Sequence, residues 1–150
     1  MIRAGIVLPT TLGVAAIERV RDGITYYVLP GGQLEDGETP PEAAVRESHE
    51  ELGLIVRVED LVAVVNFRGS TQYYYRAEPL GGEFGTGAGE EMASPASSKA
   101  GSYRPVWLDP QQLAVLDVRP PAIAAALAAT PDTARLLGDW ARRPLVVDEV

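Results

Sequence analysis

One segment of the chain, TPPEAAVRESHEELG, predicts its own local structure more sharply than any other. Thr39 is a good N-cap, Pro40 suits the first helical position, and Glu42 completes a Thr-x-x-Glu capping box. Gly53 is a natural C-terminal stop. The sequence therefore predicts a helix over residues 40–52 with a loop at each end, and the rest of the fold must accommodate it.

This helix carries three acids at crowded spacing. Glu47, Glu50 and Glu51 are three and four residues apart, so an α-helix places them on one face. Like charges at that spacing destabilise an isolated helix by about 0.2–0.5 kcal/mol per pair. Mg²⁺ would offset the repulsion, because it takes oxygen ligands and is commonly held by carboxylates together with substrate phosphates. A solvated acidic face is the other interpretation, and the spacing alone leaves both open.

The remaining faces of the helix follow from the same periodicity. Arg46 lies beside the carboxylates rather than among them. The face expected to contact the core comprises Pro41, Ala44, Val45, Ser48 and Leu52.

The rest of the chain reads as strands around this helix, with further helices near the end. Apolar or alternating runs predict strands at GIVLP, GVAAIERV, ITYYVLP, LVAVVNF, TQYYYRA and RPVWL. The segments DPQQLAVL, PPAIAAALAAT and PDTARLLGDWARR favour helices, GGQLEDGE favours a loop, and the tail PLVVDEV carries no clear signal. Residues 79–102 are rich in Gly, Ser and Ala and predict a long mobile loop. We expect one domain over residues 1–150, with a mixed β-sheet covered by helices on both faces.

Charge and composition restrict the partners. The formal net charge of −8 argues against a nucleic-acid polymer, which needs a basic face, but it permits a small phosphorylated ligand if metal ions neutralise the charge between them. The absence of cysteine excludes disulfides and thiolate metal sites. No segment has the layout of a signal peptide or is long enough to span a bilayer, so we expect no membrane partner and a cytoplasmic location. The alanine-rich, lysine-poor composition suggests a bacterial source.

The loop and helix together, GQLEDGETPPEAAVRESHEELGL, resemble the signature of the Nudix hydrolases. That signature is Gly, five residues, Glu, seven residues, Arg-Glu, an aliphatic residue, any residue, Glu-Glu, any residue, Gly and an aliphatic residue. The matching positions are Gly32, Glu38, Arg46, Glu47, Ser48, Glu50, Glu51, Gly53 and Leu54. Only Ser48 departs, standing where the family has an aliphatic residue. We expect its hydroxyl to bond back to the carbonyl of residue 44, leaving the helix slightly underpacked and the chemistry intact.

The resemblance implies a Nudix-type α/β/α sandwich and Mg²⁺-dependent hydrolysis, with Mn²⁺ as a possible substitute. The substrate would be a nucleoside diphosphate derivative such as ADP-ribose or a nucleotide sugar, or else an oxidised nucleoside triphosphate. It implies metal binding by Glu47, Glu50, Glu51 and the carbonyl of Gly32, with these glutamates and Arg46 as the catalytic set. Glu38 would tie the loop to the helix. A non-catalytic nucleotide sensor of the same fold is the alternative, and many relatives are dimers, so a homodimer is possible.

The general base and the substrate contacts are less determined. The base is the glutamate at position 47 in some family members and lies on a later loop in others, so Glu90 and Glu91 are secondary base or metal candidates. Arg19 and Arg68 could bind phosphate through bidentate contacts, and Tyr74 could stack on a base. Solvated loop charges, surface solubility and sheet packing are the corresponding structural explanations.

Overall fold

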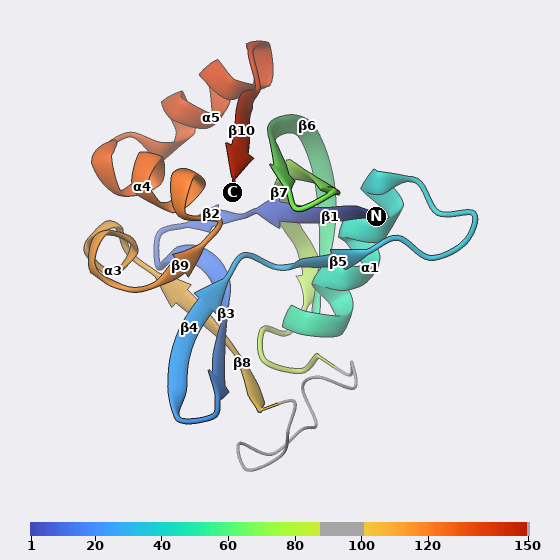
Figure 1. Cartoon of the computed structure of the whole chain (residues 1–150), viewed down its shortest axis with the longest axis horizontal. Coiled ribbons are helices and arrows are strands. Elements are labelled where there is room, and N and C mark those ends of the chain that lie inside the picture. Colours follow the sequence, from blue (N-terminus) through green and yellow to red (C-terminus); the bar gives the residue numbers. More distant parts are fainter. Residues whose placement is uncertain (88–100, 150) are drawn as a thin grey trace.

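The computed structural model describes residues 1–87 and 101–149, and these residues form two β-sheets with helices packed around them (Figure 1). The strands are β1 (Ile2–Val7), β2 (Pro9–Thr10), β3 (Gly13–Arg21), β4 (Ile24–Val28), β5 (Gly31–Gln33), β6 (Leu54–Phe67), β7 (Ser70–Gly82), β8 (Ser102–Leu108), β9 (Val118–Arg119) and β10 (Leu145–Glu149). The helices are α1 (Pro40–Leu52), α3 (Pro110–Val115), α4 (Pro121–Ala129) and α5 (Thr133–Arg142). The α/β class predicted from the sequence is confirmed.

The first sheet, sheet A, has the order β10-β6-β7-β1-β5. It is mixed, because β1 pairs parallel with β7 and β10 pairs parallel with β6, whereas the β1–β5 and β6–β7 pairs are antiparallel. The second sheet, sheet B, has the order β2-β3-β4-β9, with β8 on the other side of β3. The single mixed sheet expected from the sequence is therefore two mixed sheets in the described part of the chain.

Helix α1 has the ends that its sequence predicts. Thr39 accepts a hydrogen bond from the Glu42 backbone, the Glu42 side chain accepts from the Thr39 backbone, and Gly53 ends the helix in the left-handed region with φ 79°. Inside the helix, the fully buried Ser48 hydroxyl donates to the Ala44 carbonyl at 2.7 Å, as expected for a serine among apolar neighbours. The residue that departs from the family pattern is thus accommodated within its own helix.

The buried face of α1 differs from the predicted one. Pro41 is exposed and Val45 is 37% exposed, whereas Ala43, Glu47 and Glu51 are buried. Periodicity gives the angles between side chains but not which arc faces the protein. Here the buried arc includes two glutamates, because it faces both the core and the adjoining cleft.

Two apolar clusters lie on opposite faces of sheet A. One packs α1 against β1 and β6 and includes Ile6, Leu52 and Val56. The other combines residues of α3, α4 and α5 with residues of β6 and β7 and includes Leu127 and Trp140, with α5 packed on β6. Helices therefore cover both faces, and α1 lies across β1, β5 and β6 (Figure 1).

Three segments depart from their predicted structure. Strand β7 continues through Gly82, so residues 79–82 of the expected loop are strand. The GGQ of the expected acidic loop forms β5, the edge strand of sheet A. The tail forms β10, which pairs with β6 from Ala63 to Phe67. These strands form by backbone pairing with segments far away in the sequence, so no local pattern could predict them.

Among the described residues, no helix is long and apolar enough to cross a membrane.

Candidate functional site

Arg46 is the centre of a charged network that links α1 to the preceding loop. Its guanidinium donates to both oxygens of Glu38, at 2.7 and 3.0 Å, in a bidentate pair. It also donates to Glu47 Oε1 at 2.9 Å, to Glu50 Oε2 at 3.1 Å and to the Gln33 carbonyl at 3.1 Å. The hydrogen bond from Arg46 holds the pKa of Glu38 below its ordinary value of 4.5. One guanidinium thus fixes the positions of several carboxylates at once.

Strand β5 contacts the two buried glutamates directly. The Gly31 N–H donates to Glu51 Oε1 at 2.8 Å. Gly32 lies so close to Glu47 that a Cβ at position 32 would be 2.3 Å from Glu47 Oε1. The glycine pair therefore allows backbone and carboxylate to approach more closely than any side chain would permit. This approach also places the Gly32 backbone beside the predicted metal ligands.

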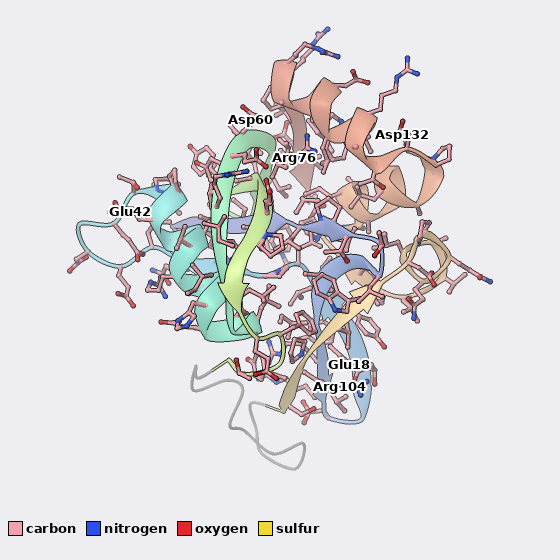
Figure 2. All side chains as sticks on the ribbon, turned by 180° about the vertical axis from the view of Figure 1, so that it is seen from behind. Glu18, Glu42, Asp60, Arg76, Arg104 and Asp132 are labelled. Carbon is pink, nitrogen blue, oxygen red and sulfur yellow. The ribbon has the colours of Figure 1, made fainter. Side chains whose placement is uncertain are left out.

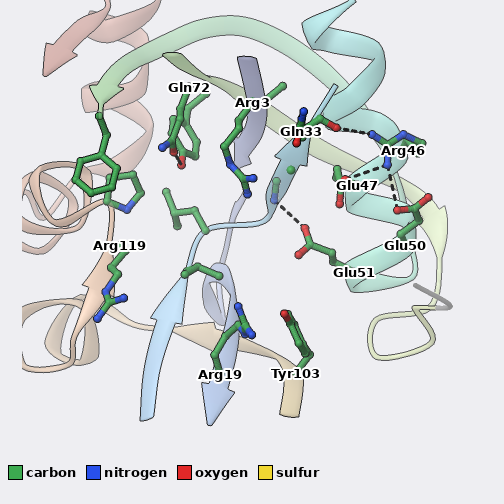
Figure 3. Close-up of a pocket in the computed structure, with 18 of the residues that line it drawn as sticks. Arg3, Arg19, Gln33, Arg46, Glu47, Glu50, Glu51, Gln72, Tyr103 and Arg119 are labelled. Atoms are coloured by element: carbon green, nitrogen blue, oxygen red, sulfur yellow. Dashed lines mark hydrogen bonds and ion pairs between the residues drawn. The ribbon is translucent and has the colours of Figure 1, made fainter. Parts of the chain in front are cut away.

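These carboxylates line one wall of a cleft of about 1230 Å³. In Figure 3 the strand that carries Gln33 runs between Arg3 on one side and Glu47 and Glu51 on the other. Because β5 contributes two glycines, little side-chain bulk separates the two sides. The cleft is large enough for a nucleotide-sized ligand.

Aromatic and guanidinium groups alternate across sheet B and form another wall. The register pairs Arg19 with Tyr103 on β8 and with Tyr26 on β4. The Arg19 guanidinium carbon lies 3.8 Å from the Tyr103 ring centroid and 5.6 Å from that of Tyr26, and the Arg119 guanidinium lies 4.2 Å from the Tyr26 ring. Such stacking holds a guanidinium by its faces. Figure 3 shows Arg19 and Tyr103 directed at the cleft, and Arg119 also lines it.

Glu18 makes two hydrogen bonds at the outer end of sheet B. Glu18 accepts from the Tyr27 hydroxyl at 3.0 Å and from Arg104 at 3.1 Å, and Figure 2 shows Glu18 and Arg104 together beside β8. Glu18 faces away from the residues that line the cleft. The pair therefore stabilises sheet B without contributing to the site.

A face of sheet A forms the floor of the cleft. The register places Arg3 of β1 opposite Gln33 of β5 on one side and opposite Gln72 of β7 on the other. Tyr74 follows Gln72 on the same face and donates its hydroxyl to Gln72 Oε1 at 2.9 Å. Burial raises the pKa of the Tyr74 phenol, so the hydroxyl keeps the proton that it donates. Gly5 leaves room for this ring, since a Cβ there would be 2.9 Å from it.

The structure brings together most of the residues that the sequence singled out. Glu47, Glu50, Glu51, Arg46, Gly32, Arg19 and Tyr74 all line the cleft. Arg68 does not, because it lies in the exposed turn between β6 and β7, over the Phe67 ring at 5.0 Å. Glu90 and Glu91 lie outside the described residues. Tyr74 lines the cleft with a buried ring whose hydroxyl is engaged by Gln72, which favours the packing explanation over base stacking.

Several lining residues were missed by sequence reasoning. Arg3, Gln72, Tyr103, Arg119 and Glu149 come from five different strands. Each looks like an ordinary polar or aromatic residue of an alternating strand, so no local signal distinguishes it. Only the strand order and register bring the five together.

The acidic wall, formed by Glu47, Glu50 and Glu51, supplies the kind of ligand that a divalent cation binds, although Arg46 lies among these side chains. Glu47 and Glu51 are 7% and 5% exposed, and Glu50 is half-buried beside them. Carboxylate and carbonyl oxygens are the ligands that hard divalent ions take. Within the described ranges, no three acidic or histidine side chains form a preassembled cluster. Binding an ion there would bring oxygens of Glu47, Glu50 and Glu51 closer together.

Comparison with known proteins agrees with this geometry. Residues 2–128 match the family model described as the NUDIX domain. The chain is 38% identical over 81 residues to a MutT-like protein of Streptomyces ambofaciens, covering 53% of this chain and 51% of that protein. It is 38% identical over 80 residues to an 8-oxo-(d)GTP phosphatase of Mycolicibacterium smegmatis, covering 51% of this chain and 24% of that protein. The matches thus span about half or less of these relatives' own length.

The fold has solved counterparts. An ADP-ribose pyrophosphatase from Streptococcus suis superposes with a TM-score of 0.61 and 17% identity, covering 99% of this chain and 98% of that one. At that identity, the likeness concerns the fold alone. The family match over residues 2–128 and the signature on α1 together establish that the chain belongs to the NUDIX family.

Proposed function

We propose that the protein hydrolyses a phosphoanhydride bond in a nucleoside diphosphate derivative, with Mg²⁺ as the cofactor and Mn²⁺ as a substitute. The observation that carries the proposal is the Arg46 network, which holds Glu47 and Glu50 within 3.1 Å of one guanidinium beside the buried Glu51. The substrate is ADP-ribose, a nucleotide sugar or an oxidised nucleoside triphosphate. The similarity to an 8-oxo-(d)GTP phosphatase supports a small nucleotide as the substrate.

The acidic wall would hold the cofactor. Glu47, Glu50, Glu51 and the Gly32 carbonyl supply hard oxygen ligands beside the cleft. Bound there, the ion would withdraw charge from the phosphoryl oxygens of the substrate and lower the pKa of a nearby water. Its charge would also reduce the repulsion that a protein of net charge −8 exerts on a diphosphate.

The residues of the chain supply binding, orientation and proton transfer. Arg19 would bind phosphate oxygens through the N–H edge of its guanidinium, since Tyr103 and Tyr26 occupy the faces. A carboxylate takes a proton as the oxygen of water attacks one phosphorus atom and the bridging P–O bond breaks. Glu47 is the leading base, and Arg46 positions it. Catalysis then depends mainly on positioning and charge stabilisation, as is general for phosphoryl transfer.

A hydrolysis screen tests the proposal. The purified chain is incubated with Mg²⁺ and with ADP-ribose, nucleotide sugars, dinucleoside polyphosphates and modified triphosphates, and released phosphate products are quantified. We expect turnover of at least one substrate class, with Glu50→Gln reducing it at least about 100-fold. A sensor without catalysis would bind nucleotide and release nothing from any substrate. Unchanged turnover in Glu50→Gln would show that the metal assignment is wrong.

A further inference from the structure

The carboxylate of Glu149 lines the cleft at one edge of sheet A, and the acidic wall lies at the opposite edge. Glu149 belongs to β10 and pairs with Phe67 of β6, and both residues line the cleft. Its Oε1 atom is shielded from solvent and accepts no hydrogen bond from any residue that the structure describes. A buried carboxylate oxygen without a donor is unfavourable unless a ligand supplies one. Glu149 Oε1 is therefore an acceptor that no residue in the described part of the chain uses.

Gln72 supplies the complementary donor on the same floor. The Tyr74 hydroxyl donates to Gln72 Oε1, which leaves the Gln72 Nε2 group as the polar end available to a ligand. Gln72 also lines the cleft, two strands from Glu149 in the order β10-β6-β7. The floor thus presents a carboxylate acceptor and an amide donor to the same side.

Glu149 and the acidic wall lie at opposite edges of sheet A. Strand β5 carries Gly31 and Gly32 at one edge of sheet A, and β10 carries Glu149 at the other. Neighbouring strands are about 4.8 Å apart, so the four steps between the edges amount to about 19 Å. Arg3 of β1 lies between them and lines the cleft. One extended ligand could therefore contact both regions with different parts of its structure.

We propose that Glu149, Gln72 and Phe67 form a nucleobase-binding subsite that selects a guanine-type base. A turn of the Glu149 side chain would bring the shielded Oε1 into the cleft, where adjacent ring N–H and amino donors of such a base pair with the two carboxylate oxygens. The neighbouring carbonyl of the base accepts from Gln72 Nε2. Phe67 contributes an aromatic surface to the ring. An adenine-type base has only its amino group to offer the carboxylate, so it makes one bond fewer. The subsite deepens the proposed function and rests on it for the role of the remaining substrate.

Binding of nucleoside monophosphates tests the subsite without any hydrolysis. Dissociation constants for GMP, IMP and AMP are measured by calorimetry or NMR titration in EDTA, because these ligands have no anhydride bond to cleave. IMP lacks the amino group and keeps the ring N–H, so it isolates one of the two predicted bonds. We expect GMP to bind at least about 10-fold more tightly than AMP, with IMP in between.

Two matched variants assign the preference to Glu149. Glu149→Gln should weaken GMP binding about 10-fold and remove the preference over AMP. Asp148→Asn removes the same charge from the neighbouring residue, whose side chain is exposed and pairs with Asn66 at 2.9 Å, and should leave both constants unchanged. Thermal unfolding of each variant checks that the fold is retained.

Three outcomes would overturn the subsite. They are equal affinities for GMP, IMP and AMP in the unchanged protein, unaltered GMP affinity in Glu149→Gln, and equal losses in Asp148→Asn and Glu149→Gln. The first needs no variant, so it stands even if Glu149→Gln fails to fold. A protein that prefers GMP but hydrolyses no nucleotide would refute the proposed function and leave the subsite intact.

Discussion

Two walls of the cleft, the acidic wall on α1 (the helix wall) and the wall on sheet B (the sheet wall), hold their charges in opposite ways. On α1, the carboxylates are held by a guanidinium of the same chain, because Arg46 contacts Glu38, Glu47 and Glu50. On sheet B, the Arg19 guanidinium is stacked against the Tyr103 ring. An ion pair occupies hydrogen-bonding groups, whereas stacking occupies only the faces of the guanidinium. The carboxylates of the helix wall are therefore already engaged by Arg46, whereas the stacking on sheet B uses none of the N–H groups of the guanidinium.

Replacing the guanidinium of the helix wall should have the largest effect. Arg46→Lys keeps the charge but loses the planar fork that joins Glu38, Glu47 and Glu50. We expect turnover to fall by about 100-fold, since misplaced ligands typically cost that much. Stability should fall by about 2 kcal/mol in urea unfolding. Wild-type turnover in this variant would mean that the network is only structural.

Adding a methyl group at Gly32 should have the next largest effect. The new Cβ of Gly32→Ala would be 2.3 Å from Glu47 Oε1, so the carboxylate must move away. We expect about a 10-fold rise in the Mg²⁺ concentration that gives half-maximal activity, with little loss of stability, because the end of a side chain can shift. Gly81→Ala is the control, since nothing lies within 4 Å of that position. The same Mg²⁺ dependence in both variants would show that Gly32 has no role in metal binding.

Removing a guanidinium from the sheet wall should raise KM rather than lower kcat. Arg19→Gln should raise KM about 10-fold, because the proposed contact is to phosphate oxygens in both ground and transition states. Arg21→Gln on the same strand is the matched control, since Arg21 is exposed and lies outside the cleft. A larger fall in kcat than rise in KM would instead assign Arg19 to transition-state stabilisation.

The smallest effect should appear in the pH dependence of stability. Arg46 lowers the pKa of Glu38 in the folded protein, so this glutamate stabilises the fold above its ordinary pKa of 4.5. That contribution is lost as the pH falls from 4.5 through the lower folded-state pKa. Urea unfolding should show Glu38→Gln to be about 1 kcal/mol less stable than the unchanged protein at pH 7. The difference should shrink as the pH falls through the lowered folded-state pKa of Glu38, and a difference that stays constant over this range would contradict the electrostatic explanation.

Much of the helix wall could be predicted from the sequence because its interactions are local. The cap at Thr39, the stop at Gly53 and the common face of Glu47, Glu50 and Glu51 all follow from helical spacing within 15 residues. The hydroxyl bond of Ser48 is local as well. The arc that the helix buries was not predictable, because it depends on what packs against it, and Val45 proved to be exposed.

Everything opposite that helix was decided by tertiary structure. Arg19 meets Tyr103 only because β3 pairs with β8, 84 positions later in the chain. Glu149 reaches the cleft only because the tail adds to sheet A as β10. Spacing along a helix is set by its own geometry, so one segment of sequence specifies it. Strand pairing depends on which distant segments find each other, and no single segment carries that information.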